Sequence, residues 1–324
     1  MDTQGTNDIL VIKLGALGDF IQALGPMMAI RRHHRDRRIT LLTAAPFADL
    51  ARAVGCADRI WIDERPRLLA PSGWIELRRR LRAGGFGRAY DLQTSDRSGW
   101  YYRLFWPGPY PEWSGIVGNS PWRHANPHRD ALHTVKRQRE QLALVGITEV
   151  PLTDLSGLAR QLGPMAEAPA APYAVVAPGG AAHRPDKRWP IERFAELARR
   201  IADNGLTPVV IGGADEALLA KQIIASCTAA RDLTGSTSLI DLVALYGKAA
   251  LAVGNDTGPM HVAAAVGCPA VVLFARASNP DLCAPRGRAV RVLRRDDLAD
   301  LGVDEVQAAV AASAIGSRTM IVPH

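Results

Sequence analysis

The sequence predicts an α/β protein built from two parallel sheets, each covered by helices. Three observations predict it. Apolar strand-like runs alternate with helical patterns along the chain, as parallel sheets require. The length of 324 residues suits about two domains, and 48% hydrophobic residues are enough for two cores. The strand-like runs are residues 9–14, 39–43, 88–92, 173–177, 208–211, 250–253 and 270–274.

A stretch rich in proline, glycine and alanine, residues 151–172, interrupts this alternation and is interpreted as a linker. It separates an N-terminal domain (1–150) from a C-terminal domain (173–324). The last helix of the chain is expected to pack either within the C-terminal domain or back on the N-terminal domain. Open α/β sheets bind ligands at the carboxyl ends of their strands. We therefore expect a cleft between two sheets, with a nucleotide on one side and an acceptor on the other.

The first strand-like run leads into a glycine turn and then a helix over residues 20–32. Gly15 and Gly18 permit a tight turn and a close approach of backbone to ligand. The turn is neither the glycine fingerprint of dinucleotide enzymes nor a P-loop, because it holds only these two glycines and no Gly-Lys-Ser/Thr follows. Asp19 closes it, either as an acid that stabilises the helix start or as a general base.

The strand-like run at 173–177 is followed by a loop with three cations, Arg184, Lys187 and Arg188. A lysine held there can place a point charge on a pyrophosphate. Solvated surface charge explains Arg188 well. It explains Lys187 less well, because the loop leaves the carboxyl end of a strand.

Residues 251–266 carry the strongest functional signal. A short apolar strand runs through a polar turn into an apolar helix that begins near Pro259, a residue suited to a first helical position. The turn thus meets the unpaired N–H groups and positive dipole end of a helix, which favour a phosphate. Asp256 in the turn can anchor a ribose hydroxyl, a sugar hydroxyl or the loop. The alternative is an ordinary capped turn between strand and helix.

The net charge of +7 is unevenly placed, with arginines gathered at residues 31–38 and 78–82. Such runs are either solvated faces or a surface for an anionic partner. Nucleic acid is not expected, because no helix-turn-helix, zinc-finger or RNA-recognition motif is visible. Eight aromatic residues lie between Trp100 and Trp122. They indicate either a surface for sugar or membrane or a satellite core under a long loop.

Other classes are not expected. The sequence contains no run of about 18 apolar residues, so no transmembrane helix is predicted. Met1 to Asp8 is polar and too short for a signal peptide, so a cytoplasmic protein is expected. The four scattered cysteines, Cys56, Cys227, Cys268 and Cys283, predict neither a zinc site nor a disulfide framework. No cofactor or metal is expected, because no Asp-x-Asp motif lies in a suitable loop.

These motifs together resemble those of the glycosyltransferase family 9 heptosyltransferases over nearly the whole chain. The resemblance implies a GT-B fold of two Rossmann-like domains facing a central cleft, and inverting transfer of a heptose from an ADP-sugar to the lipopolysaccharide inner core. Its specificity lies in the order and spacing of six segments: residues 9–19, Asp91-Leu92-Gln93 with Arg97-Ser98, 133–137, Pro178-Gly179 before 186–190, Thr234-Gly235 before Ser238-Leu239, and, most closely, 254–261.

The resemblance also implies roles for single residues. Asp19 becomes the base that deprotonates the acceptor, Lys187 binds the donor phosphates, and the turn Asp256-Thr257-Gly258 holds the donor's sugar and phosphates. Further donor contacts are expected from Gly18, Met260 and His261. Other candidates for substrate binding are Lys13, Gln93, Arg97, Pro178, Gly179 and Arg184.

The arginines and aromatic residues of the N-terminal half predict an acceptor site there, for an anionic glycolipid, and a peripheral position on the inner face of the inner membrane. The aromatic stretch from Trp100 to Trp122 departs from the family pattern. Two alternatives stay open. A sugar-nucleotide epimerase of the same fold would convert a nucleotide sugar without an acceptor. A non-enzymatic protein held at a membrane by its basic face would show no turnover.

Overall fold

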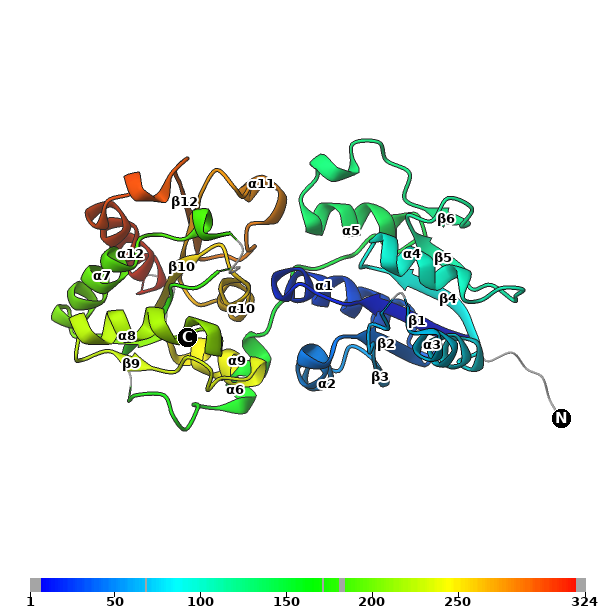
Figure 1. Ribbon diagram of the computed structural model, residues 1–324, viewed down its shortest axis with the longest axis horizontal. Helices are drawn as coiled ribbons and strands as arrows, with labels where there is room; N and C mark the ends of the chain where they lie inside the picture. The colour runs from blue at the N-terminus through cyan, green and yellow to red at the C-terminus, as the bar shows by residue number, and fades with distance from the viewer. Residues whose placement is uncertain (1–6, 68, 171, 181–183, 319–324) are drawn as a thin grey trace, which may run out of the picture. The chain divides into compact units, whose positions relative to one another are not determined.

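The computed structural model describes residues 7–67, 69–170, 172–180 and 184–318 (Figure 1). Outside this description lie residues 1–6, which belong to the polar N-terminal stretch considered too short for a signal peptide, and residues 181–183 of the cationic loop. The chain divides into two compact units, Met1–Thr153 and Asp154–His324.

The first unit is built on a six-stranded parallel sheet, among the described residues, in the order β3-β2-β1-β4-β5-β6. Strand order reverses between β1 and β4, so the loops that follow these two strands diverge and leave a crevice. Ile9 of β1 pairs with Ile39 of β2 on one side and Arg88 of β4 on the other. The strands are β1 (Asp8–Lys13), β2 (Ile39–Thr43), β3 (Arg59–Ile62), β4 (Phe86–Asp91), β5 (Glu112–Gly115) and β6 (Trp122–Arg123).

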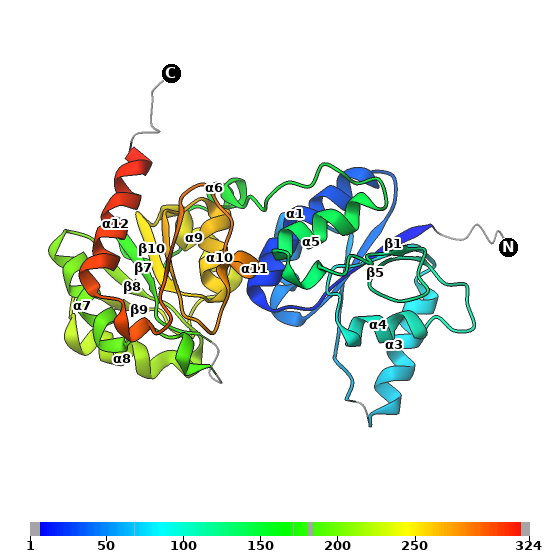
Figure 2. The same cartoon turned by 90° about the horizontal axis from the view of Figure 1, so that it is seen from above.

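Helices cover both faces of this sheet. Figure 2 shows α1 and α5, which contact each other, on one face and α3 and α4 on the other. The core under α3 and α4 joins Leu10 and Ile12 of β1 to Leu77, Tyr101 and Trp113. The helices are α1 (Leu17–His33), α2 (Ala48–Val54), α3 (Pro71–Ala83), α4 (Asp96–Arg103) and α5 (Thr134–Ala143).

The second unit repeats the same topology. Its sheet has the order β12-β11-β10-β7-β8-β9, which is the order of the first sheet when strands are numbered within the unit. The reversal lies between β7 and β10, which pair from Leu251 with Ala174 to Gly254 with Ala177. The strands are β7 (Tyr173–Ala177), β8 (Thr207–Val210), β9 (Arg231–Asp232), β10 (Leu251–Asn255), β11 (Ala270–Phe274) and β12 (Val290–Arg294).

The helices α7, α8 and α12 share one core with this sheet, centred on Phe194, Ile223 and Val306. Helices α6, α9 and α10 contact one another. The last helix, α12, packs within its own unit against α7, β10, β11 and β12. The helices are α6 (Ser156–Leu162), α7 (Ile191–Asp203), α8 (Ala217–Ser226), α9 (Leu239–Lys248), α10 (Gly258–Val266), α11 (Pro280–Cys283) and α12 (Val303–Arg318).

The prediction of an α/β protein with two parallel sheets is confirmed, and each of the seven strand-like runs contains a strand. The stretch expected to be a linker differs from that expectation. Its start is fixed to α1, since the Thr153 hydroxyl donates to the Ile21 carbonyl at 2.6 Å. It then forms α6, which packs on α9 and α10 because Ala159 is buried there. Gly163 forms the C-cap of this helix, and Pro164 follows it.

Within the described ranges, no helix is both long and apolar enough to cross a bilayer. The thiols of Cys56, Cys227 and Cys268 are buried, and that of Cys283 is half-buried.

Candidate functional site

The predicted site residues follow the strands that flank the two reversals of strand order. Lys13 and Gly18 follow or end β1, and Gln93 follows β4. In the second unit, Pro178 and Lys187 follow β7, and residues 256–261 follow β10. Doubly wound sheets bind ligands at these positions, so each unit presents a candidate site of its own.

In the second unit, the structure brings Lys187 and Asp256 together. The Lys187 ammonium lies 3.1 Å from Asp256 Oδ2, and the two side chains are only 14% and 10% exposed. The Ser278 hydroxyl donates to the same Oδ2. Contacts thus converge on one carboxylate oxygen, and among the described residues no contact of Oδ1 is seen. The free oxygen leaves Asp256 able to accept a further hydrogen bond.

Asn255, the last residue of β10, holds the loop that follows β7. Its buried amide nitrogen donates to the carbonyls of Pro178 at 2.8 Å and Gly179 at 3.2 Å, and its Oδ1 accepts from the Trp189 N–H at 3.0 Å. One side chain therefore fixes both ends of the cationic loop against β10. Sequence analysis gave Asn255 no role, although an amide at the end of a buried strand signals such bridging.

Glu216, which sequence analysis missed, joins two glycine turns. Its carboxylate accepts from the N–H groups of Gly180 at 2.8 Å and Gly213 at 2.9 Å. A Cβ atom on Gly179 would lie 1.8 Å from Glu216 Oε1, so a larger residue there would displace this carboxylate from its two N–H partners. No local motif could have shown this contact, because Glu216 and Gly180 are 36 residues apart.

Helix α10 begins at Gly258, one residue before the proline from which it was expected. Thr257 is the N-cap and makes no capping hydrogen bond with its side chain. Met260 and His261 are buried, so the Met260 side chain belongs to the core and only its backbone faces the helix start. The positive end of the α10 dipole lies at this turn, although Pro259 has no N–H and the Met260 N–H donates to the Thr257 carbonyl at 3.1 Å.

The two arginines of the cationic loop differ from each other. Arg184 is exposed, and its carbonyl accepts from the Lys187 N–H at 3.1 Å. Arg188 donates to the carbonyl of Gly180, so its charge supports the loop instead of lying free in solvent.

In the first unit, Lys13, Asp19 and Gln93 are brought together at the carboxyl ends of β1 and β4. Lys13 is buried, and its ammonium donates to the Leu92 carbonyl at 3.2 Å. Burial lowers the pKa of Lys13, and the charges of Asp19 and Asp91 partly offset this. Gln93 accepts from the Leu14 N–H at 2.9 Å. Asp19 is half-buried in the first turn of α1, one residue after Gly18.

The same place holds charged groups that sequence analysis did not single out. Asp91 is fully buried, and burial raises its pKa to about 6 although its Oδ1 accepts from the N–H groups of Gln93 and Thr94. Arg129 donates to the Thr94 hydroxyl, and Arg137 donates to that of Thr134 at 3.0 Å. Arg129 and Arg137 thus lie near Lys13, and each also pairs with Asp130, at 3.1 and 3.6 Å.

A pocket of about 600 Å³ opens at the same edge. Gly15, Phe47, Glu64, Arg65 and Gln93 are among the residues that line it. The glycine turn needs Gly15, whose φ of 127° other residues rarely adopt. Arg65 closes one side by donating to the Leu14 carbonyl at 2.6 Å. The pocket has room for one or two sugar rings.

Arg97 does not join this group. Its guanidinium donates to the Tyr101 hydroxyl at 2.8 Å and to the Pro66 carbonyl at 3.1 Å, and it lies over the Trp74 ring. None of these partners is a predicted site residue. The substrate-binding role predicted for Arg97 is therefore not supported by its contacts.

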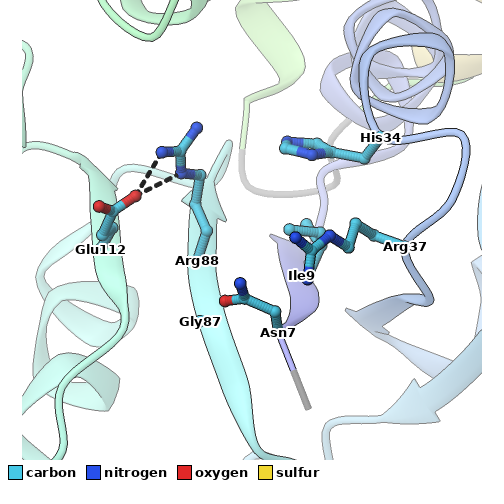
Figure 3. A pocket seen from close by; sticks show the side chains of 7 residues that line it. All are labelled: Asn7, Ile9, His34, Arg37, Gly87, Arg88 and Glu112. Carbon is cyan, nitrogen blue, oxygen red and sulfur yellow. Dashed lines mark hydrogen bonds and ion pairs between the residues drawn. The ribbon is translucent and has the colours of Figure 1, made fainter. Parts of the chain in front are cut away.

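A different pocket, of about 350 Å³, lies at the amino ends of β1 and β4. Figure 3 shows its charged groups: Arg88 is bonded to Glu112 on one side, and His34 and Arg37 lie on the other. Burial and the neighbouring cations lower the pKa of His34 to about 4, and the Tyr90 hydroxyl is 2.8 Å from its Nε2. The pocket is at the opposite end of the strands from the predicted residues.

The arginine runs make many contacts within the chain. Arg31 bonds to Asp58 at 2.6 Å and to carbonyls that follow α1. Arg78 donates to the Trp106 carbonyl, and Arg82 to those of Phe105 and Trp106. These arginines cap a helix end and fix a loop, so they are not simply a solvated face.

Several known proteins are similar to this chain. Residues 74–303 match the model of glycosyltransferase family 9 (heptosyltransferase). Lipopolysaccharide heptosyltransferase 2 of Escherichia coli K12 is 38% identical over 120 residues, 36% of this chain and 34% of that protein. The aligned part is thus about a third of that relative's length. Lipopolysaccharide heptosyltransferase 1 of Pseudomonas aeruginosa PAO1 is 27% identical over 298 residues, 87% and 82% of the two chains.

The fold agrees with this family. The structure of E. coli ADP-heptose lipopolysaccharide heptosyltransferase II matches with a TM-score of 0.79 at 24% identity, covering 96% of this chain and 99% of that one. The predicted GT-B class, with a Rossmann-like sheet in each unit, is confirmed. The chain belongs to glycosyltransferase family 9, the heptosyltransferase family.

Proposed function

We propose that this protein is an inverting glycosyltransferase that moves a heptose or related sugar from an ADP-sugar to an anionic glycolipid of the lipopolysaccharide core. The observation that carries the proposal is the Lys187–Asp256 pair beside the start of α10, at the reversal of strand order in the second unit. A lysine, a carboxylate and the positive end of a helix at one point match a ligand with both phosphates and hydroxyls.

The donor half of the site is assigned to the second unit. Lys187 contacts the diphosphate, and the N–H groups at the start of α10 stabilise the charge that develops on the leaving ADP. Asp256 Oδ1 accepts a hydroxyl of the sugar or ribose. Asn255 and Glu216 hold the loops in place, so these groups do not need to reorganise during the reaction.

The acceptor half is assigned to the first unit. Asp19 removes the proton of the acceptor hydroxyl as its oxygen attacks the anomeric carbon. The bond from this carbon to the phosphate oxygen breaks in the same step, so the sugar is inverted and ADP leaves with the electron pair. Lys13, Arg129 and Arg137 favour an acceptor that carries carboxylates or phosphates. Such a lipid-linked acceptor places the protein in the cytoplasm, peripherally on the inner face of the inner membrane.

Incubation of the purified protein with ADP-heptose, with and without a truncated lipopolysaccharide core, tests this function. We expect ADP release and transfer of sugar only with the acceptor, and a product of inverted anomeric configuration. Conversion of the nucleotide sugar without acceptor identifies an epimerase instead. If no nucleotide sugar from a panel raises the melting temperature or turns over with any acceptor, the protein is not an enzyme of this class.

A further inference from the structure

The surface over α3 and α4 of the first unit combines exposed apolar side chains with arginines. Leu69, Ile75, Trp100 and Trp106 are 96%, 66%, 56% and 67% exposed. Residues 67–106 contain eight arginines against three acidic residues, which is most of the net charge of +7 of the whole chain. Exposed large apolar groups that gather in one place mark an interaction site.

Contacts link several of these groups to one another. Ile75, Arg78, Arg79 and Arg82 are spaced as one stripe along α3. Arg78 and Arg82 donate to the Trp106 carbonyl at 2.7 and 2.9 Å, which holds the backbone of this exposed residue beside α3. Trp74 of α3 and Trp100 of α4 line a common pocket of about 490 Å³. Arg103 lies over the Trp100 ring, 4.4 Å from its centroid.

The aromatic stretch from Trp100 to Trp122 therefore divides into two parts. Tyr101, Phe105 and Trp113 are buried in the core of the unit, as a packed cluster would be. Trp100 and Trp106 point outward, where no core needs them. The buried rings thus belong to the core of the unit, and a surface role stays open for Trp100 and Trp106 alone.

We infer that this surface, called here the α3–α4 face and made of Leu69, Ile75, Trp100 and Trp106 with Arg67, Arg78, Arg79, Arg82 and Arg103, binds the surface of a bilayer that contains anionic lipids. Tryptophan rings favour the interface between headgroups and hydrocarbon. Arginines beside them reach lipid phosphates while their stems cover apolar surface. Two acidic residues, Glu76 and Asp96, also lie here, but Glu76 is paired with Arg79.

A bilayer suits this face better than a nucleic acid or a protein groove. Nucleic acid would leave the exposed leucine and isoleucine in contact with phosphates. The inference rests on the proposed function for its purpose, because a lipid-linked acceptor lies at a membrane. The face is on the unit to which the acceptor is assigned.

Sedimentation with vesicles tests the inference, using the whole protein without substrates. We expect binding to vesicles of phosphatidylcholine with 30% phosphatidylglycerol to exceed binding to pure phosphatidylcholine by at least about tenfold at 50 mM salt, and to weaken at higher salt. The variant R67Q/R79Q/R103Q should lose about fivefold per arginine. The matched control R160Q/R199Q/R291Q, exposed arginines of the second unit, should lose much less.

The apolar contribution is tested separately. W100S/W106S should weaken binding about tenfold, whereas L162S/L218S, which changes exposed leucines of the second unit, should not. Brominated lipids should quench tryptophan emission in the native protein but not in W100F/W106F bound to the same vesicles. Equal binding to both kinds of vesicle, or equal effects of the face variants and their controls, would overturn the inference.

Calorimetry with ADP separates this inference from the proposed function. All face variants should bind ADP as the native protein does. A native protein that binds vesicles but not ADP or any nucleotide sugar would contradict the function and leave the α3–α4 face standing. Binding of a soluble protein partner, with no binding to anionic vesicles, would show that the face serves a protein instead.

Discussion

The two units have the same strand order but hold their strand-end loops in different ways. In the second unit, hydrogen bonds and one ion pair do this: Asn255 and Glu216 each bridge two loops, Ser278 supports Asp256, and Asp256 pairs with Lys187. In the first unit, the corresponding place contains Lys13 and Asp91, both buried and both titratable. One topology therefore supports a hydrogen-bonded frame for a fixed ligand group and a charged cluster whose state depends on protonation.

The largest effect on activity should follow from substitution of Asp19, because the proposed base lies in the first unit and the proposed ADP site in the second. Asp19→Ala should lower turnover by about two to four powers of ten, because general base catalysis contributes this much. The affinity for ADP should change little, because the ADP site is assigned to the second unit. Turnover and ADP binding measured on the same preparation check both expectations. Near-native turnover in this variant with the true acceptor would show that Asp19 is not the base.

A pH titration should distinguish the units by stability. Burial raises the pKa of Asp91 from 3.8 to about 6 in the folded protein. Between these values the folded state binds more protons than the unfolded state, so this group favours folding below about pH 4 and loses that contribution as pH rises through 6. Because Asp91 is fully buried, the loss amounts to up to about 3 kcal/mol.

The variant Asp91→Asn should not show this loss. The free energy of unfolding, measured with urea at pH 4.5 and 7.5, should fall more for the native protein than for the variant as pH rises. The amide oxygen of the variant can still accept from Gln93 and Thr94. His34 acts in the opposite direction, because its lowered pKa costs stability as pH falls from 6.5 toward 4. The native-minus-variant difference cancels that contribution. Parallel pH profiles of the two proteins would disprove the titration of Asp91.

Within the second unit, Lys187→Ala removes a charge-assisted contact, worth about 1.5–3 kcal/mol. ADP should bind roughly 10 to 150 times more weakly by calorimetry, and the difference should grow at low salt. Arg199→Ala, an exposed cation on α7, is the matched control and should leave ADP binding unchanged. An unaltered ADP affinity in the lysine variant would place the phosphates elsewhere.

The smallest effect should come from Ser278, which positions Asp256 and touches no reacting atom. Ser278→Ala removes one of the two groups bonded to Oδ2 and should raise the KM for the nucleotide sugar about threefold to tenfold, with little change in kcat. Ser278→Thr keeps the hydroxyl and should restore the KM. A fall in kcat with unchanged KM would argue for a different role.

The sequence predicts elements and contacts to different extents. Buried strands such as β1 and β7 are continuous apolar runs and can be predicted directly. The strand β9, Arg231–Asp232, is exposed and polar, so no pattern marks it. Local contacts behave likewise: the helix start at Gly258 follows from its turn, with an error of one residue.

Partners far apart in the chain could not be predicted. Ser278 meets Asp256 across 22 residues, and Arg82 meets Phe105 across 23. Such pairs depend on how strands are ordered and not on any local pattern. For this reason Glu216 and Arg129 were missed, and the hydrogen bonds of Arg78 and Arg97 were not foreseen.

The ion pair of the second unit has a consequence for selectivity. In the free protein, Asp256 neutralises the Lys187 ammonium 3.1 Å away. A simple anion such as inorganic phosphate meets an ammonium whose charge Asp256 already offsets, and it offers the carboxylate no hydroxyl group of a sugar. A nucleotide sugar brings phosphates and hydroxyls together, so it compensates both charges at once. On the proposed function, the pair makes the site discriminate against the small anions of the cell without any steric barrier.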